Sequence, residues 1–311
     1  MRIHAARSRS LEDKHGQVGH LTYALITPAR NEAEFIERTI QSALAQTLRP
    51  VRWIIVSDGS TDGTDEIVKQ YADQHAWIEF VRMPERKERH FAGKAHAFSA
   101  GFARLKNLEY DIVGNLDADI SFDEDYFAFL LDKFAEDPNL GVAGTPFREG
   151  SHQYDYRFTN IDHVSGACQL FRRECFEAVG GYKPIRGGGV DWVAVTAARM
   201  KGWNTRTFCD KVCIHNRPIG TAQSTTLAAR FRLGVKDYSL GGQLLWEAFR
   251  SLYQMRTKPY VLGGICIFSG YLWALLSRSE KAIPRELIEF HQKEQLSRLK
   301  TLFFGILRRH P

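Results

Sequence analysis

Two carboxylates, Asp117 and Asp119, are separated by one small residue and follow an apolar run of strand-like composition. Carboxylates this close repel each other when both are ionised, and a divalent cation relieves that repulsion while gaining oxygen ligands. The spacing therefore indicates a metal site that could hold a diphosphate. The alternative is a turn or a helix start, because Ser121 and Glu124 form a capping-box pattern directly after the pair.

Strand-like and helix-like segments alternate through the first part of the chain. Pro28 is expected to end the first strand, and Asn31 is expected to cap the first helix. The alternation predicts βαβ units, and hence an α/β fold with a mostly parallel sheet and helices on both faces. The apolar runs predict strands at residues 23–27, 52–56, 78–81 and 112–116, and apolar residues at helical spacing predict helices over 35–44, 67–71 and 94–105.

Polar residues follow three of the predicted strands. They are the segment 27–32, Asp58, and the pair Asp117 and Asp119. In open parallel sheets, ligands bind beyond the carboxyl ends of the strands. We therefore expect these three loops to meet in one crevice.

Several short segments, in order along the chain, resemble the family 2 glycosyltransferases. The resemblance covers roughly residues 21–245 and implies the GT-A nucleotide-diphospho-sugar transferase fold, inverting transfer, and Mg2+ or Mn2+ as cofactor. Two departures are Ser57, where the family usually has a first Asp, and Val190, where an acidic residue usually precedes Asp191. The segments are 27–32, 42–47, 56–64, 93–97, 116–119, 165–167, 171–173, 179–182, 189–192 and 201–203.

The resemblance assigns expected roles to particular residues. Asp191 is the expected catalytic base, following the glycine-rich loop 186–190. The expected metal ligands are Asp117, Asp119 and His215. The expected donor-binding residues are Thr27, Ala29, Glu32, Asp58, Lys94, Asp117, Arg230 and Arg232.

Each of these roles has a structural alternative. Asp58 could shape a turn, and Glu32 could be a first-turn charge favoured by the helix dipole. Asp191 could cap the helix that carries Val195 and Ala198. Lys94 could be a solvated lysine at a helix start, and His215 could be structural. Arg230 and Arg232 could be surface charges on a helix.

Composition limits the partners and the compartment. The chain has 311 residues, a net charge of +6 and 25% charged residues, which fits an anionic partner such as a nucleotide or a membrane face. Its basic residues are spread out, so no nucleic-acid partner is expected. Five cysteines without a CxxC pair favour reduced thiols over zinc. Residues 1–20 lack the apolar core of a signal peptide and are expected to be a flexible lead-in.

The C-terminal part changes character. Residues 260–277 form a run of 18 residues without a charge, flanked by Lys258 and Arg278. As a helix the run would be about 27 Å long, which is marginal for a bilayer core of about 30 Å. A short spanning or re-entrant helix, an interfacial hairpin and a core helix remain open. The segment after Pro284 predicts a basic amphipathic helix.

The resulting expectation has three parts along the chain: a lead-in (1–20), a GT-A catalytic domain (21–245) and a membrane-associated helical tail (246–311). The expected activity is metal-dependent, inverting sugar transfer from a nucleotide-diphospho-sugar to a polysaccharide or lipid-linked acceptor at the cytoplasmic face of the cell membrane. One alternative is another nucleotide-sugar enzyme, although no GxGxxG or Walker pattern follows the first strand. The other is a non-catalytic nucleotide-sugar sensor or scaffold.

Overall fold

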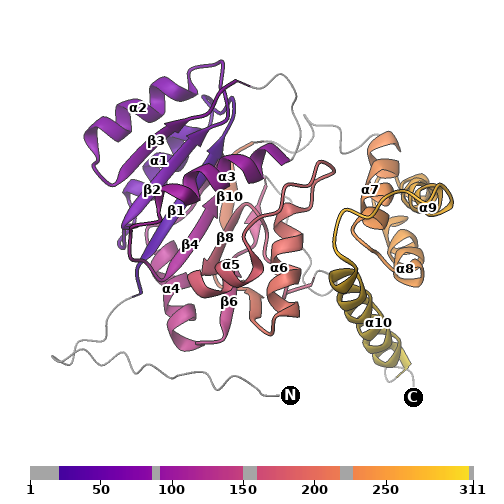
Figure 1. Ribbon diagram of the computed structural model, residues 1–311. Coiled ribbons are helices and arrows are strands. Elements are labelled where there is room, and N and C mark those ends of the chain that lie inside the picture. The colour runs from indigo at the N-terminus through magenta and orange to yellow at the C-terminus, as the bar shows by residue number, and fades with distance from the viewer. Residues whose placement is uncertain (1–20, 86–91, 150–159, 218–226, 308–311) are drawn as a thin grey trace.

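The computed structural model describes residues 21–85, 92–149, 160–217 and 227–307, with only the backbone for 303–307. The predicted lead-in (1–20) lies outside the described residues. Figure 1 shows a sheet covered by helices, and beside it a group of helices formed by the C-terminal part of the chain.

The central sheet has seven strands in the order β3-β2-β1-β4-β8-β6-β9. β8 runs antiparallel to both of its neighbours, and the other neighbouring pairs are parallel. The prediction of a mostly parallel sheet is therefore confirmed. The strands are β1 (Tyr23–Ala29), β2 (Arg52–Ser57), β3 (Ile78–Arg82), β4 (Ile112–Leu116), β6 (Leu140–Gly144), β8 (Cys168–Arg172) and β9 (Asn204–Thr207).

Helices cover both faces of this sheet because its inner strands are apolar on both sides. In β1, Tyr23 and Leu25 join one buried cluster, and Ala24 and Ile26 join the other. The first cluster includes residues of α1 and α4, and the second includes residues of α3, α5 and α6. The helices are α1 (Ile36–Leu44), α2 (Thr64–Gln74), α3 (Ala92–Arg104), α4 (Tyr126–Glu136), α5 (Arg173–Val179) and α6 (Val190–Met200).

A small second sheet joins distant parts of the chain. Its order is β5-β10-β7, formed by β5 (Ile120–Ser121), β10 (Cys213–His215) and β7 (Phe147–Arg148). β10 pairs antiparallel with β5, so that His215 lies opposite Ile120. This pairing brings His215 beside the Asp117–Asp119 segment.

The C-terminal helices pack at very short range. They are α7 (Leu227–Ser239), α8 (Leu244–Gln254), α9 (Val261–Leu276) and α10 (Arg285–Leu307). A Cβ atom at Gly234 of α7 would lie 1.8 Å from the Ile267 carbonyl oxygen of α9, and one at Gly270 would lie 2.0 Å from the Phe231 oxygen. A Cβ atom at Gly264 would lie 2.3 Å from the Ser251 oxygen of α8. These glycines therefore let the three helix backbones touch, which explains the presence of Gly264 and Gly270 in the apolar run.

Several predicted boundaries were wrong. Pro28 lies within β1 and does not end it. Asn31 adopts a left-handed conformation (φ 56°) and accepts a hydrogen bond from the Thr61 N–H, whereas α1 begins five residues later. Ser121 belongs to β5, so the capping-box interpretation fails, and α4 begins at Tyr126. Tertiary pairing of these loop residues replaces the local capping that the sequence suggests.

The apolar run at 260–277 forms α9, a helix of 16 residues. Among the described residues, no helix is both long enough and apolar enough to cross a bilayer. The spanning alternative for residues 260–277 is therefore not supported. The division at residue 245 and the membrane association of the tail stay predictions, and α7, which precedes that division, packs closely on α9.

Candidate active site

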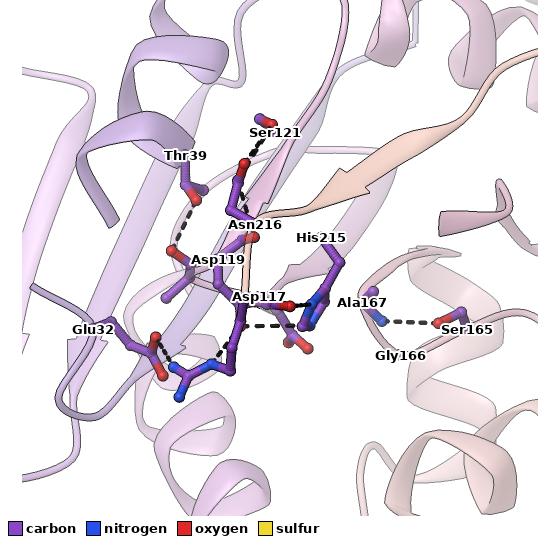
Figure 2. A network of polar contacts seen from close by, with 12 residues as sticks. Glu32, Thr39, Asp117, Asp119, Ser121, Ser165, Gly166, Ala167, His215 and Asn216 are labelled. Carbon is purple, nitrogen blue, oxygen red and sulfur yellow. Dashed lines mark hydrogen bonds and ion pairs between the residues drawn. The ribbon is translucent and has the colours of Figure 1, made fainter. Parts of the chain in front are cut away.

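Three acidic side chains gather at the carboxyl ends of β1 and β4. Figure 2 shows Glu32, Asp117 and Asp119 close to His215. Arg217 donates to Glu32 and, through Nε at 3.1 Å, to Asp119 Oδ2. Burial raises the pKa of Glu32 to about 7, and the charges of Asp119 and Asp117 add to that rise while Arg217 opposes it. Three carboxyl groups thus share one strand end, and a cation bound beside them would reduce their mutual repulsion.

Lys94 links the first carboxylate to the opposite side of the site. Its Nζ lies 2.5 Å from Asp117 Oδ1 and 3.2 Å from the carbonyl oxygen of Gly166, to which it donates. Burial acts to lower the pKa of Lys94, but Asp117, together with Asp191 and Asp119, raises it, and the net pKa is raised. Lys94 is therefore a protonated ammonium held beside the carboxylates, and not a solvated charge at a helix start.

Asp191 lies in the first turn of α6, where Gly189 is the N-cap, so the prediction that Asp191 caps this helix was wrong. Its Oδ2 accepts a hydrogen bond from the Gly166 N–H at 3.2 Å. The carbonyl oxygen of Gly166 accepts from Lys94, which pairs with Asp117. One peptide segment at Gly166 therefore connects the candidate base to the candidate donor site.

A cleft of about 2430 Å³ joins these groups. Its lining includes the carboxylates and His215 as well as residues of the C-terminal helices. The glycine-rich loop 186–189 and Asp191 also line it. A cleft this large admits a nucleotide sugar together with a second substrate.

The donor atoms of Asp119 and His215 fit a divalent cation. The His215 Nδ1 lies 2.9 Å from the Arg217 carbonyl oxygen, and in the neutral ring this nitrogen carries the proton and donates. Nε2 then carries a free lone pair, and this nitrogen lies 3.4 Å from Asp119 Oδ2. Two neighbouring ligands of an octahedral ion are about 3 Å apart for bonds of about 2.1 Å.

The protein supplies few ligands for such an ion. Within the described parts of the chain, no group of three or more His, Cys, Asp or Glu side chains is arranged to hold a metal. A magnesium-like ion commonly takes one or two protein ligands and completes its shell with substrate phosphates and water. The residues present thus suit an ion that binds together with a diphosphate.

Three of the expected donor-binding residues are buried behind the site. Thr27 is fully buried, and its hydroxyl accepts from the Trp53 indole N–H at 2.9 Å. The Ala29 carbonyl accepts from the backbone N–H of Asp58, and Asp58 Oδ2 lies 3.7 Å from Arg30 Nη1. All three lie at the expected end of β1 or β2, but they are not among the described residues that line the cleft.

The two expected arginines line the cleft from α7. Arg230 donates to the Gln254 side chain at 3.2 Å and to the Lys258 carbonyl at 3.0 Å, so its guanidinium joins α7 to the end of α8. Arg232 is exposed on α7 and lines the cleft. The described structure brings neither of them into the cluster around Asp119.

Sequence reasoning assigned no role to Arg217 or to Gly166. Arg217 bridges Glu32 and Asp119, and its guanidinium carbon lies 5.2 Å from the centre of the Phe35 ring. Its position two residues after His215 was the available signal, because His215 ends the short strand β10 and Arg217 closely follows that strand. Gly166 leaves room for Asp191, since a Cβ atom there would lie 2.8 Å from Asp191 Cβ.

Comparison with known sequences identifies the sheet part of the chain. The model for the family described as "Glycosyl transferase family 2" matches residues 24–160. Residues 24–160 are therefore similar to glycosyltransferase family 2. Poly-beta-1,6-N-acetyl-D-glucosamine synthase of Staphylococcus aureus (strain COL) is 37% identical over 117 residues, which cover 37% of this chain and 26% of that protein.

A second curated relative and three solved structures extend the comparison. The family 2 region is 32% identical to the corresponding Staphylococcus epidermidis synthase over 141 residues, which cover 45% of this chain and 32% of the synthase. The matched region is thus about a third or less of the length of these relatives. The mannosyltransferase PcManGT of Pyrobaculum calidifontis, solved with GDP-Man and Mn2+, has a TM-score of 0.56 at 21% identity and covers 90% of this chain and 81% of that one.

Two further structures share the fold. Staphylococcus aureus TarS 1-349 in complex with UDP-GlcNAc has a TM-score of 0.53 at 14% identity, covering 83% of this chain and 73% of its own. GalNAc-T7 with UDP, GalNAc and Mn2+ has a TM-score of 0.53 at 15% identity, covering 76% of this chain and 51% of its own. At these identities the likeness concerns the fold, and it confirms the expected GT-A-like α/β architecture.

Proposed function

We propose that this protein transfers a sugar from a nucleotide-diphospho-sugar to a polysaccharide or lipid-linked acceptor at the cytoplasmic face of the cell membrane. The observation that supports it is the Gly166 segment, which connects Asp191 to Lys94 and Asp117 within one cleft. Donor-side and acceptor-side groups are thereby held within reach of a single bound sugar. The named ligands of the similar proteins, GDP-Man and UDP-GlcNAc, belong to this class of donor.

The proposed reaction is a single inverting displacement. Asp191 accepts the proton of the acceptor hydroxyl, whose oxygen forms a bond to the anomeric carbon. The bond from that carbon to the diphosphate oxygen breaks, and its electron pair leaves with the diphosphate. Lys94 holds Asp117 in place on the side of the leaving group.

Asp119 and His215 would hold Mg2+ or Mn2+, with Asp117 beside them. When bound, such an ion neutralises charge that develops on the departing diphosphate. Arg217 neutralises part of the Asp119 and Glu32 charge in the described arrangement. The positively charged groups thereby keep several carboxylates together at a buried strand end.

The decisive experiment is a donor screen with UDP-, GDP- and dTDP-sugars, with Mn2+ or with a chelator. We expect one donor class to bind and to be turned over only with metal, with release of the nucleoside diphosphate. Asp119→Ala should abolish turnover, whereas Asp123→Asn, an exposed carboxylate in the following loop, should not. A chelator without effect on donor affinity would refute the metal assignment.

A nucleotide-sugar sensor is the second candidate, because Val190 removes the acidic neighbour expected beside Asp191. A sensor would bind a donor tightly and release no nucleoside diphosphate with any acceptor. Where transfer does occur, nuclear magnetic resonance of the product tests whether it is inverting, because an inverting enzyme gives the anomer opposite to that of the donor.

A further inference from the structure

The outer faces of α8 and α9 carry most of the exposed large apolar side chains of the described chain. Ten of the fourteen such residues lie in the segment 244–276. They are Leu244, Leu245, Leu252, Tyr260, Val261, Leu262, Ile265, Trp273, Leu275 and Leu276. Figure 1 shows α9 at the edge of the molecule, with α7 between it and the sheet. We call this set the α8–α9 face.

The face follows from the helical spacing of the residues. On α9, Leu262, Ile265, Trp273 and Leu276 recur on one side and are 46–82% exposed. The opposite side of α9 holds small residues, including Gly264 and Gly270, which contact the neighbouring helices. The large side chains thus point outward because the close packing of the helices leaves no room for them inside.

On α8, the burial pattern is reversed relative to a helix that faces water. Glu247 and Ser251 are 1% and 2% exposed, whereas Leu245 and Leu252 are each 63% exposed. The buried Glu247 lies near Arg250, which pairs with Asp237 of α7. A helix that buries charge and exposes leucine is poorly suited to contact with water alone.

Basic residues border the face at both ends of α9. Arg256 and Lys258 are exposed before the helix, and Arg278 is exposed after it. Glu280 is an exposed acidic residue nearby, so the border remains net positive. A second copy of this chain, docked through the same face, would bring two such borders together and would be repelled.

We propose that the α8–α9 face docks in the plane of an anionic lipid surface. Apolar side chains enter the boundary between headgroups and acyl chains, while the basic border contacts anionic headgroups. Trp273 and Tyr260 have the amphipathic ring type that is enriched at this depth. The inference rests on the membrane location in the proposed function and adds the surface through which the protein would bind. The docking itself requires no donor and no turnover.

The test is co-sedimentation of the full chain with vesicles, without donor, using phosphatidylcholine alone or mixed with phosphatidylglycerol. We expect binding to the mixed vesicles and about a tenfold or greater loss of affinity for the double variant L262S and L276S. Val51→Ser is the matched control, because Val51 is 41% exposed in the sheet part. Arg278→Gln should weaken binding to the mixed vesicles and leave binding to phosphatidylcholine unchanged.

Three outcomes would overturn the proposal. One is wild-type protein that stays in the supernatant with both vesicle types, and another is a Val51→Ser loss equal to that of the double variant. The third is a lipid-free dimer in sedimentation velocity that the double variant dissociates. Donor turnover on a water-soluble acceptor is measured separately, so failed docking leaves the transferase proposal intact.

Discussion

The sheet part and the C-terminal helices of this protein differ in where they place charged and apolar side chains. In the sheet part, Trp53 and Phe127 are fully buried, and three carboxyl groups gather at the ends of β1 and β4. In α8, Glu247 is buried and Leu245 is exposed. Burial therefore has a different cause in each part. In the sheet part, apolar surface is removed from water. In the C-terminal helices, glycine contacts bring the helix backbones together, and many large side chains lie outside.

The largest expected effect separates catalysis from stability in the sheet part. Asp191→Asn should lower kcat by about 10²–10⁴-fold, the usual contribution of a general base. The thermal midpoint should hardly change, because the amide oxygen can still accept from the Gly166 N–H. Asp210→Asn, at an exposed position, is the control. Retained activity in Asp191→Asn, alongside loss in Asp119→Ala, would place the base elsewhere.

The next effect tests the glycine spacing of the helices. Gly270→Ala should lower the free energy of unfolding by about 1–3 kcal/mol, because the new methyl group would meet the Phe231 carbonyl oxygen at 2.0 Å. At Gly187, no atom of the described residues lies within 4 Å of the Cβ position, so Gly187→Ala should be nearly neutral in stability. Urea unfolding measures both. Equal stability of the two variants would contradict the close approach of α7 and α9.

The buried acid of α8 gives a prediction with a pH dependence. Burial, with a further rise from Asp237 and an opposing effect of Arg250, raises the pKa of Glu247 to about 8. In the folded chain Glu247 therefore keeps its proton up to about pH 8, whereas in the unfolded chain it loses the proton above a pKa of about 4.3. The free energy of unfolding consequently falls as pH rises from about 5 to 8.

The variant Glu247→Gln should not show this fall in the free energy of unfolding with rising pH. Relative to wild type, the variant should gain on the order of 1–2 kcal/mol at pH 8 and little at pH 5. Glu289→Gln, at a half-exposed position paired with Arg285, serves as the control and should show no such trend. Unfolding curves at the two pH values measure the difference. A gain that is the same at both would show that Glu247 does not titrate in this range.

The smallest effect tests the join between the two parts. The Arg199 guanidinium donates to both Glu294 oxygens, at 2.7 and 3.0 Å, and thereby ties α6 to α10. Glu294→Gln should cost about 1 kcal/mol, because this pair is largely buried, whereas Arg285→Gln should cost less than about 0.5 kcal/mol at an exposed pair. Thermal unfolding of both variants, at low and high salt, provides the measurement. A larger loss for the exposed pair would contradict the structural ranking.

The sequence predicted the strands and the shared strand-end crevice well, for a physical reason. Apolar runs that are buried on both faces are distinctive, and parallel strands place their carboxyl ends together, which brought Glu32 and the Asp117–Asp119 pair to one edge. The third expected member, Asp58, lies at the end of β2 but is not among the described residues that line the cleft. The helix starts failed because Asn31 and Ser121 bond to distant partners, Thr61 and Asn216, in place of local backbone. Local patterns cannot report such pairings.

The C-terminal helices were predicted less well than the sheet. The uncharged run at 260–277 resembles a membrane helix in hydropathy. Hydropathy alone does not report that glycines in this run contact the neighbouring helices while large apolar residues face outward. The Arg217 bridge was missed for a related reason, since it joins residues 185 positions apart. The roles assigned to Asp191, Asp119 and His215 stay predictions that the experiments above address.

The partners of Asp119 carry a consequence for how the protein is made. Its side chain pairs with His215 and Arg217, which leave the ribosome almost a hundred residues after it. A nascent chain that ends at residue 160 contains the whole family-matched segment, yet Asp119 lacks these two partners and Lys94 lacks the Gly166 carbonyl. The cluster around Asp119 is therefore complete only after β10 has been made, and we expect a chain truncated before β10 to lose the proposed donor binding.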